Sequence, residues 1–177
     1  MLGAVGPAMT QVAAEVADGL LCHSFTTSGY LHEVTLPKIE RVLLQEKRTR
    51  ADFTVVGMPF VAMGETQAEL DRAIAAARRH VAFYASTPAY RAVLDFHGWG
   101  ELQPEMLRLS KLGEWQEMGQ RVPDRMLETF VVIGNASACA RQLRERFDGV
   151  LDLICGYSEN APGMPAALLA ALRTHSA

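Results

Sequence analysis

Apolar and polar positions along the chain alternate in blocks that predict short strands, each followed by a helix. An apolar stub over residues 2–5 ends at Gly6-Pro7, and apolar residues then recur at positions 9, 12, 13 and 16, the spacing of one helix face. Pro7 suits the first helical position, where its missing N–H costs nothing. Asp18-Gly19 ends this helix before a second apolar run at 20–22. We therefore expect strand, helix and strand over residues 2–22.

Later segments extend the same alternation. Ser28 is expected to cap a helix that Pro37 kinks or restarts, and residues 52–63 predict one strand with a bend near Gly57. Thr66 and Glu69 form a T-x-x-E capping box, which predicts a helix to about residue 85. The remaining expectations are a helical excursion over about 87–120, a strand over 129–133, a helix over 136–147 stopped by Gly149, a strand over 150–157 and a helix over 165–175.

Strands that alternate with helices predict βαβ units, a parallel sheet and an α/β fold class. An α/β barrel usually needs about 250 residues and eight strands. Far fewer than eight strands are found here, so we expect residues 1–177 to be a single domain that forms part of a barrel.

Composition narrows the function classes. Apolar residues make up 49% of the 177 positions and no long uncharged apolar window occurs, so we expect neither disorder nor a membrane partner. The net charge of −3 comes without a basic stripe, so nucleic acid is not an expected partner. Three cysteines without a C-x-x-C pair, scattered histidines and the lack of a signal peptide predict a cytoplasmic protein with no metal site.

Several segments together resemble the luciferase-like monooxygenases. The residues 3–9, Gly-Ala-Val-Gly-Pro-Ala-Met, followed by 14–19, resemble the central strand–helix–strand passage of that family. Residues 83–90 and 97–100, and Leu109-Ser110-Lys111 with Trp115, are similar to its deazaflavin-dependent (coenzyme F-420 type) subgroup. The resemblance covers nearly the whole chain but only the C-terminal half or so of a family member.

The resemblance implies the C-terminal half of a TIM-like (β/α)8 barrel, with a deazaflavin, or alternatively FMN, at the C-terminal ends of the strands. It implies hydride transfer to or from a small-molecule substrate. The acid/base residues of the family lie upstream of Met1, so no catalytic residue is named. A half-barrel leaves strand edges and an apolar face open, which predicts a homo-oligomer or a complementary N-terminal half as partner.

The turn Val5-Gly6-Pro7-Ala8 is the main candidate site. A strand end there leads into a helix whose free N–H groups and positive dipole end suit an anion. The resemblance implies the cofactor phosphate at this turn, although Val5 stands where family members have a second glycine. Alternatively, Gly6-Pro7 merely starts a helix. His23 follows the next strand and should reach the same edge, as a donor to cofactor or substrate or as an ordinary loop histidine.

Other chemistry-bearing residues leave alternatives open. Met58 and Phe60 line either the barrel mouth or, more commonly for such residues, the core. Three residues of the excursion belong either to a substrate pocket or to a homodimer surface: His97, Trp99 and Trp115. His80 and His32 are expected to be solvated, and Cys22 and Cys155 to be inert thiols within strands. For the whole chain, the alternative to an oxidoreductase is a non-catalytic remnant or an oligomerising accessory chain.

Overall fold

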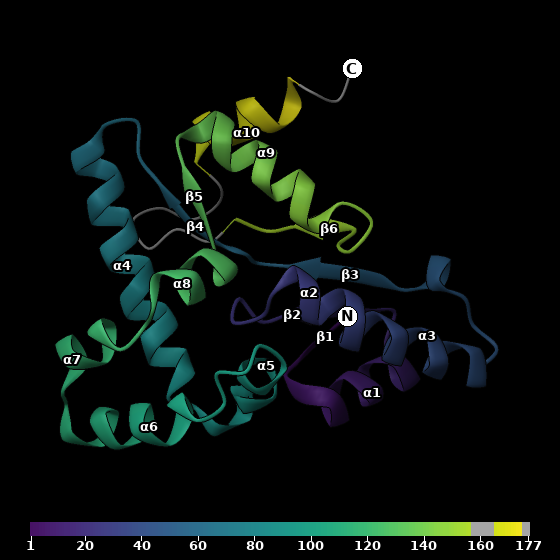
Figure 1. The fold of residues 1–177 in the computed structure, drawn as a ribbon. Helices are drawn as coiled ribbons and strands as arrows, with labels where there is room; N and C mark the ends of the chain where they lie inside the picture. Colours follow the sequence, from purple (N-terminus) through teal and green to yellow (C-terminus); the bar gives the residue numbers. More distant parts are fainter. Residues whose placement is uncertain (157–164, 175–177) are drawn as a thin grey trace.

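The computed structural model describes residues 1–156 and 165–174, which form an α/β fold built on parallel strands (Figure 1). One sheet has the order β1-β2-β3-β6, and β4 and β5 form a second pair; every pairing is parallel. This is the arrangement expected for part of a (β/α)8 barrel. The strands are β1 Leu2–Ala4, β2 Gly19–Cys22, β3 Thr54–Gly57, β4 Phe60–Met63, β5 Val131–Gly134 and β6 Leu153–Ile154.

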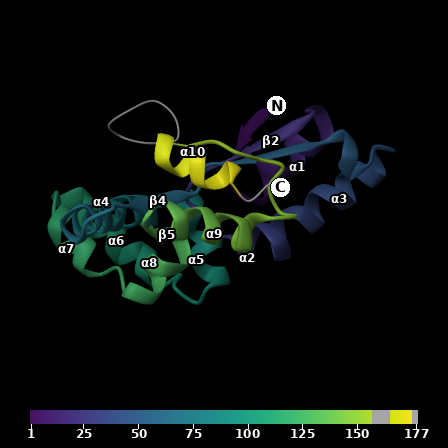
Figure 2. The same cartoon turned by 90° about the horizontal axis from the view of Figure 1, so that it is seen from above.

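Helices gather in two groups. Figures 1 and 2 both show α1 and α3 beside the first strands, and α4, α6, α7 and α8 at the opposite end of the molecule. The predicted helical excursion is confirmed and continues through α8. The helical elements are α1 Gly6–Val16, α2 Ser28–Tyr30, the π-helical segment η1 Leu31–Thr35, α3 Leu36–Gln45, the 3-10 turn η2 Arg50–Asp52, α4 Gln67–Ala85, the 3-10 turn η3 Pro88–Tyr90, α5 Arg91–Phe96, α6 Leu102–Leu112, α7 Trp115–Gln120, α8 Asp124–Phe130, α9 Ala136–Phe147 and α10 Ala166–Arg173.

The prediction of one strand over residues 52–63 is wrong. β3 pairs with β2 and β6, whereas β4 pairs with β5 in the other sheet. Met58 and Pro59 separate them, and Pro59 has no N–H to donate to a strand ladder. The bend predicted near Gly57 is therefore the point where the chain passes from one sheet to the next.

Two further boundaries are corrected. Residues 129 and 130 end α8 instead of starting a strand, because the Thr129 hydroxyl donates to the Arg125 carbonyl over 2.8 Å and Phe130 packs into the core. Thr27, not Ser28, caps α2, since its Oγ1 accepts from the Tyr30 N–H over 3.1 Å. The restart predicted at Pro37 is confirmed: α3 begins at Leu36, directly after η1.

The C-terminal elements are shorter than expected. The strand predicted over 150–157 is reduced to β6, and its last predicted residue, 157, lies outside the described residues. The closing helix is confirmed as α10, while position 175 again lies outside the described residues. The helix with the Thr66–Glu69 capping box is confirmed as α4, with both reciprocal hydrogen bonds present.

Two buried clusters meet at β4. One packs the four-stranded sheet against α1, α3 and α9, and the other fills the space between α4 and the helices of the excursion. Val61 and Met63 pack against the first cluster and Ala62 lies in the second, which is the alternation expected of a strand buried on both faces. β4 thereby fixes the helical excursion to the sheet.

One row of residues that are paired across the four-stranded sheet belongs to neither of the two buried clusters of the described residues. From β1 to β6, this row consists of Gly3, Leu21, Val56 and Leu153. Leu153 is 56% exposed, and it lies on β6, which with β1 forms the edges of this sheet. The apolar row and the two edge strands are the part of the fold that a complete barrel would cover.

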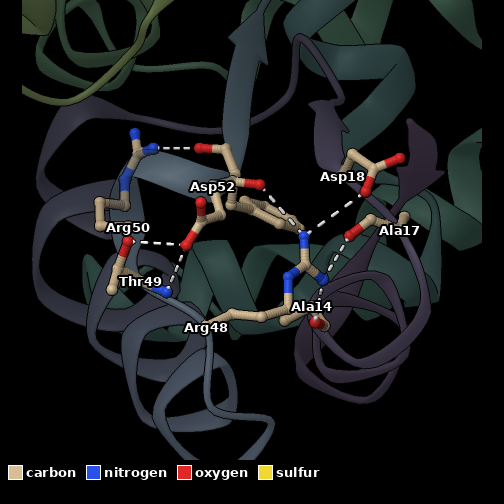
Figure 3. A network of polar contacts seen from close by, with 8 residues as sticks. Ala14, Ala17, Asp18, Arg48, Thr49, Arg50 and Asp52 are labelled. Atoms are coloured by element: carbon tan, nitrogen blue, oxygen red, sulfur yellow. Dashed lines mark hydrogen bonds and ion pairs between the residues drawn. The ribbon is translucent and has the colours of Figure 1, made fainter.

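Arg48 fixes the C-terminal end of α1 (Figure 3). Its guanidinium donates to the carbonyls of Ala17 and Asp52 over 2.8 and 3.1 Å, and to that of Ala14 over 3.3 Å. It also lies 3.7 Å from the Asp18 carboxylate. A cation at these carbonyls offsets the negative end of the helix dipole. Arg48 thus links the C-terminal end of α1 to η2.

Candidate functional site

The C-terminal ends of β1 and β2 meet at one small cavity of about 40 Å³. Val5, Gly6 and Pro7 line it together with His23, so the structure brings the two predicted segments to the same edge of the sheet. Lys38 of α3 also lines it. Ala8 is exposed and does not line the cavity.

The backbone at the start of α1 is open to a ligand. Val5 is the N-cap residue, and no side chain caps the helix there. Gly6 has φ +76°, and a Cβ at this position would meet nothing within 4 Å. The Thr10 hydroxyl donates to the Gly6 carbonyl over 2.9 Å, which holds this first turn. The N–H groups of the turn and the Lys38 ammonium are the donors that an anion requires.

The cavity is small: about 10–15 Å³ of such space holds one water molecule, so 40 Å³ has room for about three.

His23 is held in one tautomer. Its Nδ1 accepts a hydrogen bond from the Phe25 backbone N–H over 3.0 Å, so the proton of the neutral ring lies on Nε2. The ring stacks on Tyr90 with centroids 4.7 Å apart and meets the edge of Tyr84 at 4.6 Å. Burial lowers the pKa of His23 from its ordinary value, which favours the neutral donor.

A larger groove adjoins His23 at the carboxyl ends of β2, β3 and β6. It consists of two cavities of about 190 and 220 Å³ that share Ser24, Met58, Phe60 and His80. The first also includes His23 and Tyr84, and the second Cys155. We call this pair of cavities the carboxyl-end groove.

Three expectations change in this groove. Met58 and Phe60 line it, and Phe60 also packs against the second buried cluster. His80, expected to be solvated, is half-buried and stacks on Phe60 with centroids 6.2 Å apart. Cys155, expected within a strand, follows β6 and is exposed, whereas Cys22 is buried in β2 as predicted.

The aromatic residues of the excursion separate into two places. The Nε2 of His97 lies 2.8 Å from the Thr27 hydroxyl, and its ring stacks on Trp99 with centroids 5.1 Å apart. Trp115 instead is 51% exposed on α7, where it lines a shallow depression with residues of α4. The choice between pocket and dimer surface for these residues stays open.

Sequence reasoning missed four residues at the site: Lys38, His80, Tyr84 and Tyr90. Lys38 shares a helical face with Leu31 and Thr35, and all three line the smaller cavity, so helical spacing could have indicated it. Both tyrosines lie in the segment 83–90 that carries the family resemblance, but no local pattern indicated that they contact His23.

The described residues add two negative observations. No group of three His, Cys, Asp or Glu side chains among them is placed to hold a metal ion. No helix in the same part of the chain is both long and apolar enough to cross a membrane.

Comparison with known proteins links this geometry to one family. Residues 1–153 match the family model of the luciferase-like monooxygenases. An uncharacterized protein of Mycobacterium tuberculosis is 48% identical over 153 residues, covering 86% of this chain and 45% of that protein. A 5,10-methylenetetrahydromethanopterin reductase of Archaeoglobus fulgidus is 28% identical over 162 residues, covering 88% of this chain and 47% of that protein. The chain therefore spans about half the length of these relatives.

Solved structures confirm the fold. A coenzyme F420 dependent tetrahydromethanopterin reductase from Methanopyrus kandleri superposes with a TM-score of 0.71 at 23% identity, over 98% of this chain and 48% of that one. An F420-dependent secondary alcohol dehydrogenase superposes with a TM-score of 0.60 at 15% identity, over 87% and 41% of the two chains.

Proposed function

The chain belongs to the luciferase-like monooxygenase family, and we propose that it forms the cofactor-phosphate side of an oxidoreductase that uses a deazaflavin of the coenzyme F420 type, or alternatively FMN. One observation carries the proposal: Gly6, at the uncapped start of α1, and His23 line the same cavity at the carboxyl ends of parallel strands. In barrels of this kind the carboxyl ends of the strands hold the active site.

The residues present fit a phosphate group. The first turn of α1 offers backbone N–H groups, Gly6 leaves space where a Cβ would stand, and Lys38 supplies a positive charge. A bound deazaflavin supplies the hydride donor or acceptor of the reaction. The chain's own residues bind its phosphate at the mouth of the cavity, and His23 offers an N–H group to the cofactor or the substrate.

The names of the relatives favour deazaflavin over FMN. Two structural neighbours and their reductase relatives are described as F420-dependent or as tetrahydromethanopterin reductases. A flavin cofactor remains the alternative, since a neighbouring EDTA monooxygenase superposes with a TM-score of 0.58 at 12% identity.

Fluorescence titration tests this proposal, with coenzyme F420 and FMN as the two probes. Gly6→Ala places a methyl group in the proposed phosphate site, and we expect it to weaken F420 binding about tenfold, which corresponds to about 1.4 kcal/mol. Gly98→Ala is the matched control, because Gly98 has the same φ of +76° and an equally open Cβ position but does not line the cavity.

Two results would refute the phosphate site. If the wild-type chain binds neither probe, the proposed cofactor role is wrong. If Gly6→Ala and Gly98→Ala lose F420 affinity equally, the effect is due to backbone strain and not to a phosphate site. Lys38→Gln is a second test, because loss of the ammonium group should weaken F420 binding and make that binding less sensitive to salt concentration.

The second candidate function is an oligomerising chain without catalysis of its own, favoured by the edge strands β1 and β6 and by the exposed Leu153. Either a second copy or a complementary N-terminal half would cover these edges. Sedimentation of the purified chain should show a dimer or larger species. A compact monomer that melts cooperatively would contradict this part of the proposal.

A further inference from the structure

The carboxyl-end groove contrasts with the smaller cavity in its charge. The smaller cavity contains Lys38 and a helix N-terminus. The described residues that line the groove include no Lys, Arg, Asp or Glu. Its polar side chains are Ser24, His23, His80, Tyr84 and Cys155, and none of these carries a carboxylate, an ammonium or a guanidinium group.

An anion in this groove would lose its hydration without gaining a counter-charge from these walls. Burying an unpaired carboxylate or phosphate is strongly unfavourable, whereas an uncharged oxygen needs only one hydrogen-bond donor. The apolar walls, which include Met58, Phe60 and Leu168, suit a hydrocarbon body. These walls therefore suit an uncharged ligand better than an anion.

One donor stands at the junction of the two sites, because His23 lines both the smaller cavity and the groove. Its Nδ1 is engaged by Phe25, and Nε2 has no hydrogen-bond partner among the described residues. Among the described residues, every buried side-chain nitrogen or oxygen has a hydrogen-bond partner. Since Nε2 has none, it is not buried and is accessible from a cavity or from solvent. An N–H group so placed can donate to a ligand oxygen.

We propose that the carboxyl-end groove binds an uncharged, largely apolar substrate bearing a carbonyl or hydroxyl oxygen, and that this oxygen accepts a hydrogen bond from Nε2–H of His23. This inference rests on the proposed oxidoreductase function and names its substrate class. It disfavours phosphorylated and carboxylate substrates in the groove, because the described walls carry no Lys or Arg to neutralise their charge.

Ligand-observed NMR on the full chain at pH 7.5 tests the substrate class without any cofactor. The probes are cyclohexyl methyl ketone and cyclohexanecarboxylate, which have similar shape and differ in charge. We expect saturation transfer to the ketone, and binding of the carboxylate weaker by about tenfold or more. Equal binding of the two probes, or no transfer to the ketone at millimolar concentration, would overturn the proposal.

Variants locate the binding. His23→Phe keeps an aromatic ring between Tyr84 and Tyr90 but removes the donor, and should weaken ketone binding about tenfold. His32→Phe is the matched control, because His32 is exposed and lines neither cavity. Met58→Trp fills the groove without changing His23 and should abolish ketone binding. Undiminished binding in both the His23 and Met58 variants would overturn the assignment to this groove.

The two proposals fail separately. A chain that binds the ketone in the groove but binds neither F420 nor FMN refutes the proposed function and leaves the neutral groove in place. A chain that binds F420 at the Gly6 site but accepts the ketone and the carboxylate equally refutes only the substrate class.

Discussion

The Nδ1 atom of His23 accepts a hydrogen bond from the Phe25 backbone N–H, and this contact makes the turn after β2 dependent on the protonation state of the ring. A protonated imidazole has N–H groups on both nitrogens and cannot accept. Phe25 is almost fully buried and stacks on Phe130 with centroids 4.4 Å apart, so its backbone is not free to move away. Protonation of His23 therefore conflicts with the packing beside it.

We predict that this conflict makes the folded chain less stable in mild acid. Burial lowers the pKa of His23 in the folded state, so the unfolded chain takes up a proton first as the pH falls below about 6.5. The stability contribution is complete above that value and is lost as the pH falls through the lower folded pKa. Urea unfolding between pH 7.5 and 5 should show this loss, and long-range ¹H–¹⁵N spectra should show the Nε2–H tautomer at pH 7.5.

Variants assign the pH dependence. His23→Asn keeps an acceptor for Phe25 but does not titrate, so the dependence on pH should become weaker. His97, whose pKa is also lowered chiefly by burial, contributes in the same direction and should retain its share in that variant. The exposed His32 provides the control, and a His32→Asn chain with the same reduced dependence as His23→Asn would refute the assignment.

The second prediction concerns Arg48. Its three carbonyl acceptors and the Asp18 carboxylate depend on one planar guanidinium, so Arg48→Ala should lower the free energy of unfolding by about 2 kcal/mol. Arg48→Lys should lose less stability than Arg48→Ala but should not match the wild-type chain, because an ammonium group cannot reach all the carbonyls at once. Urea denaturation measures both variants.

The same Arg48 variant has a consequence at the proposed site. Because Arg48 holds the far end of α1, its loss should also weaken F420 binding at Gly6. Arg41→Ala on the exposed face of α3 is the control and should change neither property. Full stability in Arg48→Ala would show that water replaces the guanidinium at these carbonyls without cost.

Local chemistry explains what the sequence predicted correctly. The start of α1 and the capping box of α4 depend on residues within four positions of each other, and both were predicted at the right place. The meeting of Val5 with His23 was also predictable, because carboxyl ends of neighbouring parallel strands lie at one edge of a sheet.

Contacts between distant segments explain the failures. Residues 55–63 are apolar throughout, and nothing in their order shows that β3 pairs with β6 while β4 pairs with β5. Tyr84 and Tyr90 reach His23 across more than 60 positions of sequence, from a helix end and a 3-10 turn. Their place at the site depends on how the helical excursion packs, which no short pattern encodes.

The third prediction tests the capping box of α4, which begins directly after β4. The Thr66 hydroxyl accepts from the Glu69 N–H over 3.3 Å, and the Glu69 carboxylate accepts from the Thr66 N–H over 3.0 Å. Thr66→Ala should lower the free energy of unfolding by about 1 kcal/mol. Thr87→Ala is the matched control, since Thr87 precedes η3 without any capping hydrogen bond from its side chain. Equal losses in the two variants would mean that the threonine methyl groups, and not the cap, carry the effect.

The fourth prediction uses the three thiols as reporters of the groove. Cys155 is exposed and lines the groove, whereas burial raises the pKa of Cys22 to about 12 and of Cys139 to about 11. Since the thiolate is the reactive form, iodoacetamide at pH 7.5 should alkylate one thiol of the folded chain rapidly and the other two about a hundredfold more slowly. Mass spectrometry of digested samples identifies the modified residue, and Cys155→Ser should remove the fast phase.

Cyclohexyl methyl ketone at saturating concentration should slow alkylation of Cys155, because a ligand in the groove covers that side chain. Rapid modification of Cys22 or Cys139 in the folded chain would contradict the burial of β2 and α9 on which this prediction depends.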